Sequence, residues 1–462
     1  MRGGRKRDCG LILFTRLPAA GRTKTRLMPY FSGEQCRELH IAMLKDLRES
    51  LKKLKGVDIY LYFLGEEGED RKKEDRKRAP ESLKRIFGSS FRYRRQRGEN
   101  LFERMALSME ELSEEGYRRI VLIGTDIPEL RANDVRLAFQ LLSESDAVLG
   151  PTEDGGYYLI GVRQPGRELF LLDSGEGSVF SRTKAAILQS GRTVSFLRHC
   201  RDIDTKEDIA VYRERIRSEP VLRRSCCGSF LLESLSIAVI VPLYNERKTI
   251  GRLKRELGAL KGSCELILVD GGSTDGTWEE LRKGKGWRLL RSEKGRARQM
   301  NLGAEKTSAD VLFFLHSDSE LPPDVPGEIR RVLARTSAGC FGIAFHSASP
   351  LMKICQFISN HRVYDRRVMF GDQGIFLYRT LFEELGGFPL LPLMEDYQLS
   401  LNLKERGICP LLCKRRIYTS ERRFRGGFFR RLRLMWQMNR LRKRYRDGVA
   451  IREIAECYRD VR

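Results

Sequence analysis

The sequence predicts an α/β protein with two sheet-containing units in tandem. Short apolar runs alternate with amphipathic helical stretches along the 462 residues, which is typical of strand–helix–strand units with parallel sheets. The pattern begins twice, with strand-like runs at residues 10–14 and 236–243. A chain of this length is sufficient for two or three domains, each with its own core.

The expected division has a first unit at residues 1–222, a linker at 223–234, a second unit at 235–413 and a basic amphipathic helical tail at 414–462. The linker is expected because its sequence, RRSCCGSFLLES, has no clear hydrophobic period. Further buried strands are expected at residues 57–64, 119–126 and 146–151 in the first unit, and at 264–270, 310–318 and 339–346 in the second.

The composition favours a folded chain with an anionic partner. Apolar residues make up 41% and charged residues 32%, as in ordinary globular proteins. The net charge of +24 predicts attraction to nucleotide phosphates, nucleic acid or an acidic membrane surface. The 11 cysteines form no CxxC pair, which favours a reducing cytoplasm over a disulfide framework or a zinc site. No apolar run approaches the roughly 18 residues of a spanning helix, so any membrane contact is expected to be peripheral.

Residues 266–277, LILVDGGSTDGT, join a buried strand to a sharp turn and the start of a helix. Asp270 stands at the strand end, two glycines allow the turn, and Ser273 begins a run of helix-capping residues. A carboxylate at the carboxyl end of a parallel strand, beside a helix N-terminus, is where open α/β sheets bind nucleotides. The segment therefore predicts a nucleotide site at this edge of the second sheet.

Three more segments of the second unit carry polar groups at strand or helix ends. VPLYNER offers Asn245 and Glu246 to a ligand, with helix capping as the alternative. DVLFFLHSDS brings Asp318 out of a buried strand, where a carboxylate is costly unless it meets a cation such as Mg²⁺ or Mn²⁺ on a diphosphate. Glu395 and Asp396 begin an amphipathic helix, where they would also compensate its dipole.

Together with EKGRARQMNLGA and GDQG, these motifs resemble the family 2 glycosyltransferases of the GT-A fold over residues 236–410, and most closely the branch called radical-SAM/selenodomain-associated transferase 2. The resemblance implies inverting transfer of a sugar from a nucleotide-sugar to a hydroxyl acceptor, with Asp396 as general base beside Glu395. It assigns Mn²⁺ or Mg²⁺ to Asp318, the last DxD aspartate. The implied donor contacts are Pro242, Asn245, Glu246, Asp270, Lys294, Arg296, Arg298, Asn301, Asp318, Asp372 and Gln373.

One position departs from that family's pattern. The first DxD residue is His316 instead of an acid. Imidazole can ligate Mn²⁺, whereas Mg²⁺ prefers oxygen. We therefore expect Asp318 to carry the metal with water and the donor diphosphate.

In the first unit, the loop FTRLPAAGRTKTRLMP gathers Arg22, Lys24 and Arg26, whose cations and backbone amides can hold a diphosphate or triphosphate. GTD then brings Asp126 to a strand end, and a later DIDT segment supplies Asp204. These two aspartates are candidates for one shared metal site.

GTD, EDGGYY and DIDT as a set resemble radical-SAM/selenodomain-associated transferase 1, a GT-A-like group that is also similar to nucleotidyltransferases, over residues 10–212. Glu153 and Asp154 of EDGGYY join the expected site. For this unit, nucleotidyl transfer, sugar transfer and loss of activity all stay open.

The tail is strongly basic, with 14 Lys or Arg against one acid between residues 414 and 446. Apolar residues recur at three- and four-residue spacing, as expected for one face of a helix: Phe428, Leu432, Met435, Met438, Leu441 and Tyr445. Such a helix can lie on anionic lipid, or its apolar stripe can pack on the catalytic domain. Nucleic-acid binding is not expected because no reader motif accompanies the charge.

The sequence therefore predicts a bifunctional, metal-dependent cytoplasmic transferase. A peripheral position at the inner face of a membrane and a lipid-linked acceptor are both compatible with its basic tail. Its fold class is α/β, with two GT-A-like (Rossmann-like, nucleotide-diphospho-sugar transferase) domains in tandem. Two alternatives remain: nucleotidyl transfer by the first unit as the main chemistry, or a non-catalytic protein that binds membranes or RNA.

Overall fold

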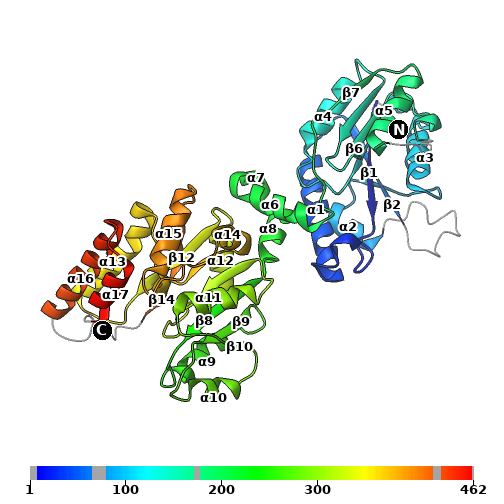
Figure 1. Cartoon of the computed structure of the whole chain (residues 1–462). Helices are drawn as coiled ribbons and strands as arrows, with labels where there is room; N and C mark the ends of the chain where they lie inside the picture. The colour runs from blue at the N-terminus through cyan, green and yellow to red at the C-terminus, as the bar shows by residue number, and fades with distance from the viewer. Residues whose placement is uncertain (1–7, 65–79, 171–176, 420–427, 460–462) are drawn as a thin grey trace. The chain divides into compact units, whose positions relative to one another are not determined.

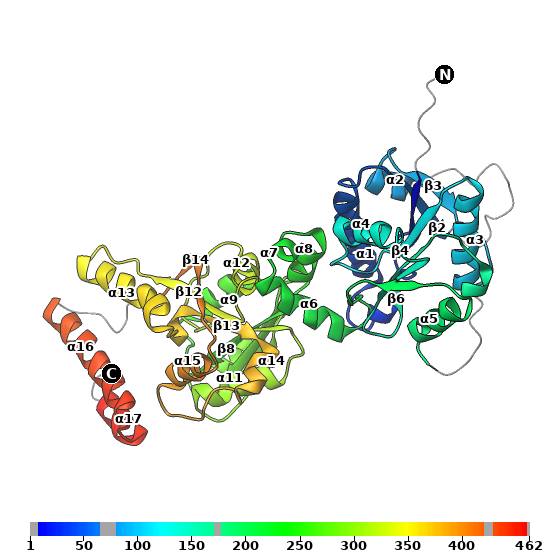
Figure 2. The same ribbon diagram turned by 90° about the horizontal axis from the view of Figure 1, so that it is seen from above.

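The computed structural model describes residues 8–64, 80–170, 177–419 and 428–459. Its contacts divide the chain into two compact units, Met1–Leu231 and Leu232–Arg462 (Figure 1). Each unit is built around one sheet with helices packed against it, as the view in Figure 2 also shows.

The N-terminal unit contains strands and helices in alternation. Its strands are β1 (Cys9–Arg16), β2 (Val57–Leu64), β3 (Arg92–Arg95), β4 (Arg119–Gly124), β5 (Ala147–Pro151), β6 (Tyr157–Val162) and β7 (Val194–Phe196). Its α-helices are α1 (Gly33–Leu51), α2 (Glu81–Phe87), α3 (Leu101–Glu114), α4 (Ala132–Leu141), α5 (Val179–Gln189), α6 (Lys206–Ser218), α7 (Pro220–Arg223) and α8 (Cys226–Glu233), with short 3₁₀ helices η1 (Thr25–Leu27) and η3 (Arg167–Leu169).

The C-terminal unit repeats this alternation. Its strands are β8 (Ile237–Leu243), β9 (Glu265–Asp270), β10 (Arg288–Arg291), β11 (Val311–Phe314), β12 (Ala338–Ala344), β13 (Ile375–Tyr378) and β14 (Leu411–Tyr418). Its α-helices are α9 (Ile250–Gly258), α10 (Thr277–Arg282), α11 (Arg296–Glu305), α12 (Val325–Leu333), α13 (Pro350–Arg366), α14 (Arg379–Glu384), α15 (Glu395–Glu405), α16 (Phe428–Arg446) and α17 (Ile451–Arg459), with the 3₁₀ helix η4 (Gly371–Gln373).

The two sheets have the same strand order. Within the described residues each sheet has seven strands, in the orders β3-β2-β1-β4-β6-β5-β7 and β10-β9-β8-β11-β13-β12-β14. The α/β class is confirmed, but the expectation of purely parallel sheets is wrong. β6 runs antiparallel to β4 and β5, and β13 runs antiparallel to β11 and β12. A short buried run such as IFLY carries no signal of strand direction, so the reversal could not be seen in the sequence.

The central strands are apolar because both sheet faces are covered. All seven residues of β12 are buried, as are all four of β11. The strands β8 and β9 also contribute almost every residue to the largest apolar cluster of the unit. This rigid sheet fixes the directions in which the loops after β8, β9 and β11 emerge.

The stretch 223–234 is largely helical instead of an irregular connector. The backbone N–H groups of Cys226 and Cys227 donate to the carboxylate of Asp46 at 2.7 and 2.8 Å. Asp46 on α1 thus caps the amino end of α8, an anion at the position that the helix dipole favours. The capping residue lies far away in the sequence, which is why local periodicity did not indicate the helix.

The basic tail has two parts. Residues 414–418, expected in a helix, form the end of strand β14, which pairs with β12. The helices α16 and α17, orange to red in Figure 1, pack on α15 through buried Leu441 and Ile454. Residues 420–427, 460–462 and the side chain of Phe428 lie outside the described residues. Among the described helices, none combines the length and apolar character that crossing a membrane requires.

Candidate functional site

A large cavity opens where β8 and β11 end and α11 begins. Its volume is about 1890 Å³. Parallel pairing sets β8 between β9 and β11, with Leu243 opposite Asp270, so the loops after these strands emerge at one sheet edge. The sequence-predicted residues that line the cavity are Pro242, Glu246, Lys294, Arg296, Asp318, Asp372, Glu395 and Asp396.

Glu395, the first residue of α15, forms a buried ion pair. Only 3% of its surface is exposed, and its Oε1 lies 3.1 Å from Nη1 of Arg296 on α11. Burial and the adjacent Asp396 carboxylate raise the pKa of Glu395, and Arg296 opposes the rise. Burial disfavours the charged form of Arg296, but the two carboxylates outweigh it and raise the pKa of that guanidinium. The hydrogen bond between them is therefore charge-assisted.

Asp396 is held by backbone N–H groups. Its Oδ2 accepts a hydrogen bond from the N–H of Gly371 at 2.7 Å, and its Oδ1 accepts one from the N–H of Tyr397 at 2.7 Å. The residue before the pair, Met394, has φ 69°, a left-handed conformation that is strained for a side chain of this size. Strain of this kind, beside a carboxylate on a cavity wall, is typical of functional segments.

Gly371 also allows His316 to approach Asp396. A Cβ built on Gly371 would lie 2.6 Å from Nε2 of His316 and 3.4 Å from Oδ2 of Asp396. No larger residue fits at this position unless its neighbours move. The side chain beside the candidate base is therefore an imidazole, in the place where the family pattern led us to expect an acid.

Within the described ranges, no group of three or more His, Cys, Asp or Glu side chains is arranged to hold a metal ion. Two potential ligands, the Asp318 carboxylate and the His316 imidazole, line the cavity in the segment that follows β11. Mg²⁺ is commonly bound by one or two carboxylates with substrate phosphates completing the shell, and imidazole suits Mn²⁺. These donors fit an ion that arrives with a diphosphate better than a permanently bound one.

Five of the expected donor contacts do not line the cavity: Asn245, Asp270, Arg298, Asn301 and Gln373. Asp270 is fully buried, and its carboxylate accepts hydrogen bonds from the N–H groups of Gly272 and Ser273 at 3.0 Å. It therefore stabilises the turn that follows β9, and its contact with a nucleoside stays a prediction.

The side chains of Asn301 and Gln373 also form hydrogen bonds with backbone groups. The Asn301 amide donates to the carbonyl of Phe388 at 2.8 Å and accepts from its N–H at 2.9 Å. Oε1 of the fully buried Gln373 accepts a hydrogen bond from the N–H of Phe370 at 3.0 Å. Both amides fix segments that border the cavity, which the sequence motif alone did not distinguish from ligand contacts.

Asn245 and Arg298 lie on the surface of the unit. Oδ1 of Asn245 accepts a hydrogen bond from the N–H of Thr274 at 2.9 Å, and Asn245 adopts a left-handed φ of 52°. Arg298 forms an ion pair with Glu293. These side chains join neighbouring loops, so a direct contact with a donor stays a prediction for both.

Sequence reasoning missed several cavity residues. Tyr244 is 37% exposed, and the Lys294 ammonium lies 4.1 Å from the centre of its ring. Arg362 on α13 and Arg442 on α16 also line the cavity. Tyr244 belongs to the VPLYNER segment, directly before Asn245, and could have been included. No rule of sequence spacing connects Arg362 or Arg442 to this site.

In the N-terminal unit, Asp126 and Asp204 converge, but on Lys24. The Nζ atom lies 3.1 Å from Oδ1 of Asp126 and 3.0 Å from Oδ1 of Asp204, and 3% of the lysine side chain is exposed. Burial favours the neutral amine, yet the two carboxylates outweigh it and raise the pKa of Lys24. Lys24 also has a left-handed φ of 52°. The ammonium thus takes the place between the acids where the sequence predicted a metal.

Further acids lie near the group formed by Lys24, Asp126 and Asp204. Burial raises the pKa of Asp202 to about 6, and the negative charges of Asp154 and Asp204 add to the rise. Oδ1 of Asp154 accepts a hydrogen bond from the N–H of Gly156 at 3.0 Å, which fixes the EDGG turn. A carboxyl group that changes charge not far below neutral pH therefore lies beside the acidic pair.

The remaining predicted residues of this unit lie at its exposed edge. Nη1 of Arg26 is 3.3 Å from Oδ2 of Asp204, with 76% of the arginine side chain exposed. Arg22 is exposed in the same loop. Glu153 is exposed as well and pairs with Arg201. The two arginines are accessible to an incoming phosphate, whereas Glu153 is engaged by a cation.

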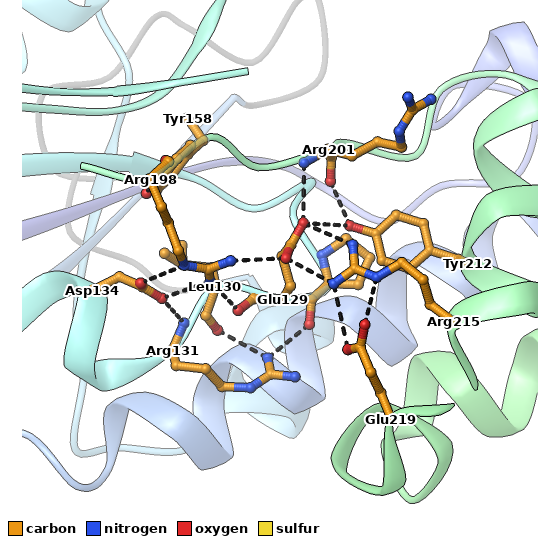
Figure 3. A network of polar contacts seen from close by, with 11 residues as sticks. Glu129, Leu130, Arg131, Asp134, Tyr158, Arg198, Arg201, Tyr212, Arg215 and Glu219 are labelled. Carbon is orange, nitrogen blue, oxygen red and sulfur yellow. Dashed lines mark hydrogen bonds and ion pairs between the residues drawn. The ribbon is translucent and has the colours of Figure 1, made fainter. Parts of the chain in front are cut away.

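Glu129, in the loop that also carries Asp126, is the centre of a polar network (Figure 3). Its carboxylate accepts hydrogen bonds from Arg198 at 2.8 Å, from Arg215 at 3.0 and 2.8 Å, and from the backbone N–H of Arg201 at 3.1 Å. Burial opposes ionisation, but these donors outweigh it and lower the pKa of Glu129 to about 2. The network joins the loop after β4 to α6 and the segment that precedes it.

Comparison with known families distinguishes the two halves of the chain. Residues 47–173 match a family described as uncharacterized protein conserved in bacteria (DUF2064), and residues 238–373 match glycosyl transferase family 2. A provisionally assigned nucleotide-diphospho-sugar transferase from Desulfovibrio desulfuricans G20, known from its crystal structure, is 30% identical. That match covers 48% of this chain and 93% of the other, with a TM-score of 0.43. The two family matches, one in each unit, confirm that two different domains stand in tandem.

Two curated relatives match different halves. A dolichol-phosphate mannosyltransferase of Pyrococcus furiosus is 34% identical over 98 residues, 20% of this chain and 28% of the relative. A 2-phospho-L-lactate guanylyltransferase of Methanocaldococcus jannaschii is 26% identical over 155 residues, 33% of this chain and 61% of the relative. The chain therefore spans less than two thirds of either relative.

Changing Glu129 to Gln should destabilise the N-terminal unit by about 2–4 kcal/mol at pH 7, because two arginines would lose a buried anionic partner. The pKa of Glu129 in the folded protein, about 2, lies below the ordinary glutamate value of 4.5. Its contribution is therefore complete above pH 4.5 and is lost as the pH falls toward 2. Thermal melts at pH 7 and pH 3 should show the gap between wild type and variant shrinking at pH 3. The exposed Glu214→Gln on α6 is the control, and equal melting of all three proteins would contradict the role.

Changing Lys24 to Met should strengthen Mn²⁺ binding to the N-terminal unit by about tenfold, because two carboxylates would lose the ammonium that neutralises them. Electron paramagnetic resonance titration of the full chain, without nucleotide, measures free Mn²⁺ directly. Lys45→Met, on exposed α1 surface, removes the same charge away from the acids and should leave the affinity unchanged. Equal affinities for Lys24→Met and wild type would mean that the acids do not form an ion site.

Proposed function

Because residues 238–373 belong to glycosyl transferase family 2, we propose that the C-terminal unit transfers a sugar from a nucleotide-sugar donor to a hydroxyl acceptor. The observation that carries the proposal is Asp396, whose carboxylate is held by the N–H of Gly371 at 2.7 Å on the wall of a large cavity. A fixed, accessible carboxylate of this kind suits a general base.

The donor diphosphate is assigned to the amino end of α11. This ten-residue helix presents free backbone N–H groups, and Lys294 and Arg296 flank its first turn on the cavity wall. Helix N-termini with adjacent cations are favourable sites for phosphates. The exposed ring of Tyr244 is available to stack on the nucleobase. Asp318, with His316 nearby, would hold a divalent ion that stabilises negative charge on the leaving diphosphate.

In the proposed reaction, Asp396 accepts the proton of the acceptor hydroxyl as its oxygen attacks the anomeric carbon. The bond from that carbon to the diphosphate oxygen breaks, and the nucleoside diphosphate leaves with the electron pair. Attack from the face opposite the leaving group inverts the anomeric configuration. Glu395 acts differently, because its ion pair keeps Arg296 at the cavity wall. The dolichol-phosphate relative supports a lipid-linked acceptor as one form of the substrate.

We propose a second activity, nucleotidyl transfer, for the N-terminal unit. The observation that favours it is the group formed by Lys24, Asp126 and Asp204, with exposed Arg22 and Arg26 in the same loop. A divalent ion on the carboxylates of Asp126 and Asp204 would compete with the Lys24 ammonium, and the two arginines would contact phosphates. The guanylyltransferase relative supports this reaction class.

Changing Asp396 to Asn should lower kcat for sugar transfer roughly 100- to 10,000-fold, since a positioned general base typically contributes that much. Binding of nucleoside diphosphates, followed by thermal shift, should persist because the donor contacts remain. Glu405→Gln, an exposed acid at the other end of α15, is the matched control and should keep wild-type turnover. Undiminished transfer by Asp396→Asn would remove the residue from the mechanism.

Changing Asp126 to Asn should abolish the release of pyrophosphate when a nucleoside triphosphate reacts with a phosphorylated acceptor. The N-terminal unit would lose one of the two carboxylates assigned to the ion that accompanies the phosphates. A coupled pyrophosphate assay on the full chain measures this. Glu38→Gln, an exposed acid on α1, should behave as wild type. If Asp126→Asn released pyrophosphate at the wild-type rate, nucleotidyl transfer would not belong to this site.

A further inference from the structure

Two arginines in the cavity of the C-terminal unit lack a direct anionic partner among the described residues. Arg362 on α13 and Arg442 on α16 both line the cavity. The Nε of each is buried and forms no hydrogen bond there, while Nη1 of Arg442 donates to Oδ1 of Asn439 at 3.0 Å. By contrast, Arg252, Arg296 and Arg330 each reach a carboxylate or a carbonyl oxygen.

The two guanidinium groups meet over one aromatic ring. The Cζ atoms of Arg362 and Arg442 lie 3.9 and 4.6 Å from the ring centre of Phe370. The ring attracts both cations without neutralising either. Burial and the charge of Arg442 lower the pKa of Arg362 to about 10, and burial also lowers the pKa of Arg442. Two like charges held together in a partly desolvated position are costly unless an anion joins them.

The position of the pair distinguishes it from the donor diphosphate site. Phe370 precedes Gly371, whose N–H holds the candidate base Asp396, and the charges of Asp372 and Asp396 act on both guanidiniums. The donor site has its own cations on the α11 side of the cavity. The arginine pair comes from α13 and α16 and the donor cations from the start of α11, so we assign the pair to the acceptor.

We propose that Arg362 and Arg442 bind a phosphate monoester carried by the acceptor. This rests on the proposed sugar transfer by the C-terminal unit. Planar guanidinium groups bind phosphate oxygens through paired N–H donors, and two of them match the charge of a monoester. The pair binds and orients, and no bond is made or broken at it. The tail thereby completes the acceptor site, which explains why α16 packs beside Phe370.

Apolar side chains at the rim of the same cavity favour a lipid as the source of the phosphate. Phe357 and Ile358 on α13 are 66% and 52% exposed, and Trp436 on α16 is 60% exposed, while all three line the cavity. An apolar chain attached to the phosphate would cover these side chains as it leaves the site. A soluble phosphorylated acceptor would use the arginines but not the rim.

Titration calorimetry of the full chain with farnesyl monophosphate, farnesol and inorganic phosphate tests the site. Farnesyl monophosphate should bind, and Arg362→Gln or Arg442→Gln should weaken it at least about tenfold. Arg362→Lys and Arg442→Lys should retain part of the affinity. Lys353→Gln on α13 and Arg433→Gln on α16 remove exposed charges outside the cavity and should bind like wild type. Melting temperatures of the two arginine variants should not fall, because their charges repel each other.

The outcomes separate the alternatives. Binding of farnesyl monophosphate far tighter than inorganic phosphate identifies a lipid phosphate, whereas equal binding identifies a soluble phosphate monoester. Farnesol binding as tightly as its phosphate, or Gln variants with wild-type affinity, would overturn the site. Binding of nucleoside diphosphates, measured in parallel, reports on the donor site. If it is absent while the arginine-dependent phosphate binding persists, the proposed sugar transfer fails and the phosphate site stands.

Discussion

The buried ion pair between Glu395 and Arg296 is the interaction on which the C-terminal site depends. It joins the first residue of α15 to the first residue of α11, which are 99 positions apart in the chain. The carboxylate is buried while 38% of the Arg296 side chain is exposed, so removing the arginine would leave a buried acid without its cation. The same pair aligns the amino end of α11, where a diphosphate would bind, with Asp396, the next residue of α15. Donor and base are thus positioned by one contact.

The N-terminal unit meets the same constraint with different residues. An acid that leaves a buried strand needs a cation, and Lys24 supplies it for Asp126 and Asp204. Asp126 follows β4 and Asp318 follows β11, which occupy the same place in two sheets of identical order. In both units the cation that pairs with the acid, Lys24 or Arg296, is remote in sequence. Equivalent scaffolds therefore carry different sites: an ammonium lies between the acids of the first, whereas Asp318 of the second lines a large cavity.

Much of this scaffold could be predicted because continuous apolar runs such as those of β8, β9 and β11 are typical of strands covered on both faces. The direction of a strand could not be predicted, because the short apolar run of β13 gives no signal of whether it is parallel or antiparallel to its neighbours. Asp270 illustrates a second limit. Its position at a strand end predicts a ligand contact, but its carboxylate accepts hydrogen bonds from the backbone N–H groups of Gly272 and Ser273. Arg442 illustrates a third limit, because a basic helix predicts a surface position while tertiary packing brings this residue to the cavity wall.

Phosphorus-31 NMR of the full chain tests sugar transfer by the C-terminal unit most directly. The chain would be incubated with UDP- and GDP-sugars, Mn²⁺ and a panel of hydroxyl and phosphate-bearing acceptors. A nucleoside diphosphate should appear only when an acceptor is present, and no pyrophosphate should form. Its rate of appearance should be the same when Asp126 is replaced by Asn. No nucleoside diphosphate from any donor, or release that disappears in the Asp126→Asn variant, would contradict it.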